Sequence, residues 1–251
     1  MSTTPLDKST PLRDSVAAEH SVTRQPATTA AASAKKKARA TDQFVALASR
    51  ILSLRGDATE AKSLGVTSCT ASEGTSTVAT QLSIALAAAG TGRVLLVELP
   101  NLIAPGRVAR RKAEAGWAEL ILGDVDVEDV TRATQAQGVW RMAAGDVKQL
   151  GTLGVDAHRL STMIRELKEH FEFVVFDLPE ANELTGCLPL ASVLDGVILV
   201  VQQGRVSSDK ALRAKLELEQ ANAQLIGVVL NKTRSYAPRL LYRLLPFLKP
   251  R

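Results

Sequence analysis

The chain has 251 residues, of which 45% are hydrophobic and 23% are charged, a composition typical of a globular protein. No run approaches 18 consecutive apolar residues, which argues against a membrane-spanning helix, and two cysteines are too few for a disulfide framework or a zinc site. The N-terminal sequence lacks the apolar segment of a secretory signal, so we expect the protein in the cytosol.

The net charge of +5 is unevenly distributed along the chain. Residues 1–42 carry a net charge of +3, residues 232–251 carry +6, and the intervening body carries −4. A nucleic-acid-binding domain concentrates basic residues on its folded body, whereas this body is acidic. The sequence therefore predicts no specific nucleic-acid partner.

Two tails are predicted to flank a single domain over residues 43–232. Residues 1–42 are rich in Ser, Thr, Ala and Pro and contain no aromatic residue, which predicts disorder. Their basic run, Lys35 to Arg39, is either a solvated linker or a contact with an anionic membrane surface. Residues 233–251 are basic and amphipathic, and they either lie on a membrane interface, dock on a membrane partner or pack on the domain.

Helical and strand-like patterns alternate from residue 43 onward. The predicted strands, in chain order, are 64–68, 93–98, 139–143, 173–176, 196–201 and 225–230. The predicted helices begin near Phe44 and continue at about 76–89, 117–122, 126–133, 160–171 and from 207 onward. Short aliphatic strands separated by helices predict an α/β fold, with a parallel sheet of about six or more strands and helices on both faces.

The turn after the first predicted strand has the layout of a phosphate-binding loop. Small residues there expose backbone N–H groups, and the helix that follows directs its positive dipole end to the same point. The motif G-x-x-x-x-G-K-[ST] is matched at Gly74 and at the metal-coordinating hydroxyl of Ser76, but Thr75 replaces the lysine and Cys69 replaces the first glycine. The candidate nucleotide-binding residues of this loop are Ser72, Glu73, Gly74, Thr75, Ser76 and Thr77.

The order of the motifs resembles the bacterial tyrosine autokinases of capsule and exopolysaccharide export, which are related to the MinD/ParA group of P-loop ATPases. In that family a loop of the form T-S-x-x-P-G-E-G-K-S-T precedes a V-L-L-I-D-A-D strand and a G-L-x-x-x-L-x-G segment. An F-D-x-V-I-I-D-T-P-P strand, a D-G-V-x-L-V-V strand and a G-V-V-L-N strand follow. The corresponding segments here, within residues 43–232, are 67–77, 94–98, 116–123, 171–179, 195–201 and 227–231. The resemblance implies a P-loop NTPase-like domain for ATP and Mg²⁺, with Asn231 in the base-contacting position.

The chain departs from this family at the charged positions of the site. The loop lysine corresponds to Thr75, the two aspartates after the second strand correspond to Glu98 and Pro100, and the third acidic position falls near Gly186. Phosphoryl transfer relies on lysine and Mg²⁺ to neutralise developing negative charge. The sequence therefore predicts a degenerate site with little or no catalytic activity.

The resemblance leaves Ser76 and Asp177 as the candidate magnesium ligands. Asp177 is either a metal-side carboxylate or a strand-end residue that caps a turn. Glu98 either replaces a missing aspartate or is a surface acid. If the protein is active, Asp177 and Glu98 are the candidate catalytic residues, and any binding of ATP and Mg²⁺ is expected at low affinity.

The leading hypothesis is a kinase-like, non-catalytic component of exopolysaccharide, capsule or adhesin polysaccharide synthesis and export. The resemblance implies an inner-membrane polysaccharide co-polymerase as the partner on the cytosolic face, and homo-oligomerisation. The family phosphorylates a tyrosine-rich C-terminal tail, whereas this chain has only Tyr236 and Tyr242.

Two alternatives keep ATP turnover. In the first, the protein is an active tyrosine autokinase that uses another lysine, such as Lys62 or Lys112, or one from a neighbouring subunit. In the second, it is a MinD/ParA-like positioning ATPase. Those proteins carry an extra lysine early in the loop, and no lysine occurs between Val66 and Thr75.

Overall fold

The computed structural model describes residues 41–53, 62–99, 114–146, 156–181 and 188–233, all within one compact unit that spans residues 39–251. Most of the two predicted tails, and the predicted positions at Pro100, Lys112, Gly186, Tyr236 and Tyr242, lie outside these ranges. Among the helices of the described ranges, none is long and apolar enough to cross a membrane.

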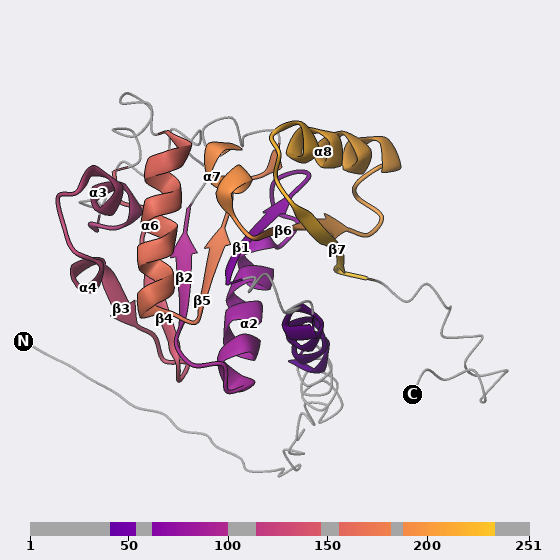
Figure 1. Cartoon of the computed structure of the whole chain (residues 1–251). Helices are drawn as coiled ribbons and strands as arrows, with labels where there is room; N and C mark the ends of the chain where they lie inside the picture. Colours follow the sequence, from indigo (N-terminus) through magenta and orange to yellow (C-terminus); the bar gives the residue numbers. More distant parts are fainter. Residues whose placement is uncertain (1–40, 54–61, 100–113, 147–155, 182–187, 234–251) are drawn as a thin grey trace, which may run out of the picture. The chain divides into compact units, whose positions relative to one another are not determined.

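A seven-stranded sheet with the order β3-β4-β2-β5-β1-β6-β7 forms the centre of this unit (Figure 1). All of its pairs are parallel except β3 with β4. The strands are β1 (Ser63–Ser68), β2 (Val94–Glu98), β3 (Thr131–Ala133), β4 (Val139–Met142), β5 (Phe173–Asp177), β6 (Gly196–Gln202) and β7 (Leu225–Asn231). This confirms the predicted α/β class and mostly parallel sheet, and it places β1 between β5 and β6.

Helices cover both faces of the sheet. Besides the helical residues 41–53, the helices are α2 (Thr75–Ala88), α3 (Trp117–Leu122), α4 (Val127–Val130), α6 (Ala157–His170), α7 (Leu188–Val193) and α8 (Ser208–Gln220). The central strands β1, β2, β5 and β6 are buried on both faces except at the last residues of β2, β5 and β6, because strands between two helical layers have no solvent-facing side.

Two hydrophobic clusters correspond to the two faces. One joins α2 and helix 41–53 to the sheet through residues such as Leu82, Leu86 and Ile51, which are almost fully buried. The other joins α3, α6, α7 and α8 to the opposite face, where Trp117 packs edge-on against Phe176 with ring centroids 5.2 Å apart. The sheet thus lies between two layers of helices, and the loops lie at the ends of its strands.

The predicted helix over residues 126–133 is only half correct. The helix α4 ends at Val130, and Thr131 adopts an extended backbone that begins β3. Residues of β3 then pair antiparallel with β4, for example Arg132 with Arg141. A three-residue strand is too short to show a hydrophobic period, so pairing rather than local pattern creates this seventh strand.

Asp195 joins three elements at the edge of the sheet where the parallel strands begin. Its Oδ2 accepts hydrogen bonds from the backbone N–H groups of Lys62 and Ser63 at 2.9 and 2.7 Å. The same oxygen lies 2.6 Å from Nζ of Lys168, near the end of α6. Because Lys62 precedes β1, it belongs to this edge and not to the edge that carries the loop, so the structure contradicts its predicted role as a substitute for the loop lysine.

Candidate functional site

The loop between β1 and α2 has the backbone conformation of a phosphate-binding loop. Ser72 and Gly74 both adopt positive φ angles, 65° and 99°, and this alternation turns successive N–H groups toward one side. Gly74 is the N-cap of α2, with no side-chain cap and no acidic residue in the first helical turn. The structure therefore brings the predicted residues 72–77 together at a helix start that, among the described residues, has no side-chain cap.

Glu73 turns its side chain away from the loop opening and into the protein. It is fully buried, and its Oε1 accepts hydrogen bonds from the backbone N–H and the hydroxyl of Thr70 at 2.5 and 2.9 Å. Its Oε2 accepts a hydrogen bond from the backbone N–H of Gln202, at the end of β6, at 2.7 Å. Of this predicted nucleotide-binding residue, only the backbone remains available to a ligand.

The end of β7 contacts the loop through two adjacent residues. Asn231 donates from Nδ2 to the carbonyl oxygen of Glu73 at 2.8 Å, and Lys232 donates from Nζ to the carbonyl oxygen of Ser72 at 2.6 Å. The Lys232 ammonium also lies 3.2 Å from Oε1 of Gln202. Asn231 was a predicted site residue, whereas Lys232 and Gln202 were missed; the only sequence signal for Lys232 is its position next to Asn231.

Gly74 fits this arrangement because it has no side chain. A Cβ atom at this position would lie 2.4 Å from Nδ2 of Asn231, closer than real Cβ atoms approach other heavy atoms. Its φ of 99° is also one that L-residues rarely adopt. The glycine is therefore required both by the turn and by the close approach of β7.

Ser76 and Asp177 form the metal side of the site. The Ser76 hydroxyl lies close enough to the Asp177 carboxylate, at the carboxyl end of β5, to lower the pKa of that carboxyl. Burial raises the pKa of Asp177 to about 6, an effect that the Ser76 hydroxyl reduces and the nearby charge of Glu98 increases. These two oxygen-bearing side chains are of the kind that Mg²⁺ prefers, and their proximity fits the pairing predicted from the sequence.

The Glu98 carboxylate forms an ion pair with an arginine. It lies opposite Asp177 in the β2–β5 register, but its Oε2 lies 3.1 Å from Nη1 of Arg141 on β4. Arg141 also pairs with Glu114, with Nη2 and Oε2 2.6 Å apart. Within the part of the chain that the structure describes, no group of three or more His, Cys, Asp or Glu residues could hold a metal ion.

Cys69 is buried directly below the loop. Burial, and secondarily the charge of Glu73, raise the pKa of its thiol to about 11, so the thiol stays protonated at neutral pH. The small side chain stands at the position of the first motif glycine.

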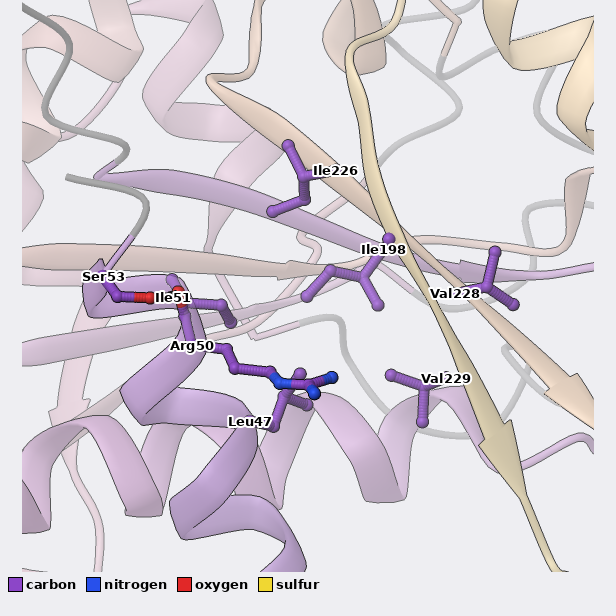
Figure 2. A pocket seen from close by; sticks show the side chains of 9 residues that line it. Leu47, Arg50, Ile51, Ser53, Ile198, Ile226, Val228 and Val229 are labelled. Carbon is purple, nitrogen blue, oxygen red and sulfur yellow. Dashed lines mark hydrogen bonds between the residues drawn. The ribbon is translucent and has the colours of Figure 1, made fainter. Parts of the chain in front are cut away.

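A separate pocket of about 320 Å³ lies between helix 41–53 and the strands β6 and β7. Figure 2 shows Leu47 and Ile51 on the helix side and Ile198, Ile226 and Val229 on the strand side. The Arg50 side chain extends from the helix toward the strands (Figure 2). No loop residue of the phosphate-binding motif lines this pocket, so it is distinct from the candidate nucleotide site.

Comparisons with known proteins identify relatives over about two thirds of the chain. The chain is 28% identical over 174 residues to the tyrosine-protein kinase CpsD of Streptococcus agalactiae, a match that covers 69% of this chain and 76% of the relative. It is 26% identical over 181 residues to the succinoglycan biosynthesis transport protein ExoP of Rhizobium meliloti, covering 69% of this chain and 22% of that longer protein.

Solved structures share the fold. The chimeric protein CapA2B2 superposes with a TM-score of 0.63 at 22% identity, covering 77% of this chain and 85% of that chain. The septum site-determining protein MinD of Pyrococcus horikoshii, complexed with Mg-ADP, gives a TM-score of 0.52 at 21% identity, covering 73% of this chain and 76% of that chain. At these identities the likeness concerns the fold alone, and it confirms the predicted P-loop NTPase-like architecture.

The model of one protein family matches residues 61–229, which include the loop, Glu98, Asp177 and most of β7. This match covers more than half of the chain. The chain belongs to the family described as cellulose biosynthesis protein BcsQ, and it shares its fold with CapA2B2 and MinD.

Proposed function

We propose that this chain is a kinase-like, non-catalytic component of a bacterial polysaccharide synthesis and export system. It would act at the cytosolic face of the inner membrane, together with a polysaccharide co-polymerase. The family description refers to cellulose biosynthesis, and the relative ExoP is named for succinoglycan biosynthesis transport. These names support a role in polysaccharide production.

The main observation in support of a non-catalytic role is that Thr75 stands in place of the loop lysine. The backbone around it is that of a phosphate-binding loop, with positive φ at Ser72 and Gly74, yet its short hydroxyl cannot neutralise the charge that a lysine would. On the metal side, Arg141 already balances the charge of Glu98. A transition state that gathers negative charge on the phosphoryl oxygens would therefore lack most of its usual stabilisation.

The test is an assay of the purified protein with ATP and Mg²⁺, with CpsD of Streptococcus agalactiae as an active control. We expect neither phosphate release above buffer nor phosphotyrosine on the protein. Phosphotyrosine that disappears when Tyr236 or Tyr242 is changed to Phe would overturn the proposal and favour the active autokinase.

A genetic experiment tests in the cell whether polysaccharide export needs a catalytic protein. Asp177→Asn removes the metal-side charge with little change of shape, so a catalytic protein would lose its function. For a non-catalytic protein, we expect this allele to restore polysaccharide export in a deletion strain as well as the wild type does. Loss of export at a normal protein level would contradict the proposal.

A further inference from the structure

We infer that the open edge of β7 is a docking site for an extended segment of a partner protein, with apolar side chains at alternate positions and a carboxylate that pairs with Arg50. β7 is the last strand at one end of the described sheet, next to β6. The pocket beside it contains no residue of the phosphate-binding loop. The inference therefore concerns a second surface and goes beyond the proposed function.

One side of the β7 backbone has no strand next to it in the described sheet. The carbonyl oxygen of Asn231 accepts a hydrogen bond from the N–H of Gln203, just beyond β6, so every second residue of β7 counted back from Asn231 directs its backbone groups to β6. Val228 and Leu230 therefore direct their N–H and C=O groups to the open side. Such groups form the hydrogen bonds by which an extended peptide joins a sheet.

The side chains of β7 do not protect this edge from pairing. Edge strands commonly contain a proline or a charged residue, especially lysine, that prevents association, and Leu225–Asn231 contains neither. Val228 and Leu230 are 57% and 63% exposed, the highest fractions among the exposed large hydrophobic side chains of the described ranges. Apolar side chains in water beside an open strand edge indicate an interaction surface.

The opposite face of β7 adjoins the pocket of about 320 Å³ between this strand and helix 41–53. Val229 lines this pocket (Figure 2), and so does Gly227, where an added Cβ atom would meet no heavy atom of the described residues within 4 Å. Successive side chains of a strand point to opposite faces. A strand added beside β7 would thus place one set of side chains in the pocket and the other set beside Val228 and Leu230.

Arg50 supplies a charge for which the described residues offer no partner. Its side chain is exposed and extends from the helix toward the strands at the pocket (Figure 2). Within the described ranges, no ion pair or hydrogen bond involves its guanidinium group. A guanidinium binds a carboxylate through charge-assisted and often bidentate hydrogen bonds. The segment that fits this site therefore combines apolar side chains with one carboxylate.

The charge of Arg50 disfavours the chain's own segments as the occupant. Residues 232–251 contain large apolar residues, but they also contain six basic residues and no acidic one, so Arg50 would repel them. A second copy that paired through its own β7 would bring no carboxylate, because Leu225–Asn231 contains none. Both Arg50 side chains would then stay without a partner. Charge complementarity thus favours a segment of a different protein.

The experiment begins with the selection of peptides on the immobilised full chain from a random library of about eight residues, slightly longer than a typical strand. We expect the selected peptides to share apolar residues at alternate positions and one Asp or Glu. Calorimetry then compares a selected peptide with two modified forms. Replacing its acid by the amide should weaken binding about tenfold. Methylating one alternating set of its backbone nitrogens should abolish binding, and methylating the other set should change it little.

Two variants of the chain test the site with the same peptide. Gly227→Leu fills the pocket where the glycine has open space, so we expect a folded protein that binds at least about tenfold more weakly. Arg50→Gln should weaken binding of the acidic peptide about tenfold and leave binding of its amide form unchanged. The matched control is Arg213→Gln, which removes an equal charge from an exposed position on α8 and should have no effect. Urea denaturation checks that each variant is folded.

Several results would overturn the inference. One is a selection that yields no peptide, and another is binding that Gly227→Leu and Arg50→Gln both leave unchanged. Self-association of the wild type that Gly227→Leu abolishes would show that the occupant is a second copy. Tighter binding of a peptide of residues 234–251 than of any selected peptide would show that it is the chain's own end. None of these results depends on ATP turnover, so the proposed function stands or fails separately.

Discussion

The folded chain disfavours the charged form of the Asp177 carboxyl group. It is partly buried at the end of β5, and Glu98 lies opposite it in the register. Burial raises the pKa of Asp177 from 3.8 to about 6. Since the folded state binds this proton more tightly than the unfolded state, the contribution to stability is complete below pH 3.8 and is lost as the pH rises through about 6.

Asp177→Asn should therefore stabilise the protein at neutral pH. In EDTA at pH 8 we expect a gain of roughly 1–2 kcal/mol in the free energy of unfolding, because the amide needs no ionisation in this environment. The gain should disappear near pH 4, where Asp177 of the wild type is itself largely protonated. Urea denaturation at the two pH values measures it, and a pH-independent difference would show that another effect dominates.

Residue identity alone left the roles at this edge of the sheet open. The sequence singled out Ser76 and Asp177 as candidate magnesium ligands, and the structure places Ser76 in the first turn of α2 and Asp177 at the end of β5. The sequence could not decide whether Glu98 is a metal ligand or a surface acid. The ion pair with Arg141 favours the surface acid, and it depends on β4 lying next to β2, which no local pattern encodes.

A few polar contacts connect helices and strands at the end of the sheet opposite the candidate site. Asp195 connects the beginnings of β1 and β6 with the end of α6. Burial by itself would raise its pKa, but Lys168 and the hydrogen bonds from Ser63 outweigh burial and lower the pKa below 3.8. Its contribution to stability is thus present at neutral pH and is lost as the pH falls through that lowered pKa.

We expect Asp195→Asn to lower the free energy of unfolding at pH 7 by roughly 2–3 kcal/mol, because charge-assisted bonds to Lys168 and to backbone N–H groups are weakened together. The comparison variant is Glu219→Gln on α8, whose exposed pair with Lys215 should contribute about 0.5 kcal/mol or less. Chemical denaturation of both proteins checks the prediction. Equal losses would mean that Asp195 is no more than a surface charge.

Among the helices and strands, long segments with a periodic apolar pattern were predicted more accurately than short segments. The helix predicted from residue 160 is confirmed as α6, since Leu160, Ile164 and Leu167 fall on one buried face. The helix predicted over residues 126–133 was wrong in its second half, because β3 exists only through its pairing with β4.

On the scale of the whole chain, charge separates the body from its ends. Residues 43–231 carry a net charge of −4, whereas residues 232–251 carry +6 and include large apolar residues. Such a basic amphipathic segment is of the kind that binds anionic membrane surfaces. The acidic body would contribute repulsion rather than attraction.

Deleting residues 234–251 tests this at the level of the molecule. The deletion removes five basic residues and no acidic one. We expect the full chain to co-sediment with vesicles containing anionic lipid at low salt, less so at high salt, and the shortened chain to stay in solution. Vesicles of neutral lipid are the control. Unchanged co-sedimentation after the deletion would assign any membrane contact to another part of the chain.

The sequence by itself determined the fold class, the parallel sheet and the position of the loop, because these follow from apolar periodicity and from small residues at a strand end. Only the tertiary structure decided which charges surround the loop. Lys232 and Gln202 reach it across β6 and β7, and Glu73 turns away from it. The contacts of Lys232 with Ser72 and of Gln202 with Glu73 join residues more than a hundred positions apart. They are set by the order of strands in the sheet, which local sequence patterns do not specify.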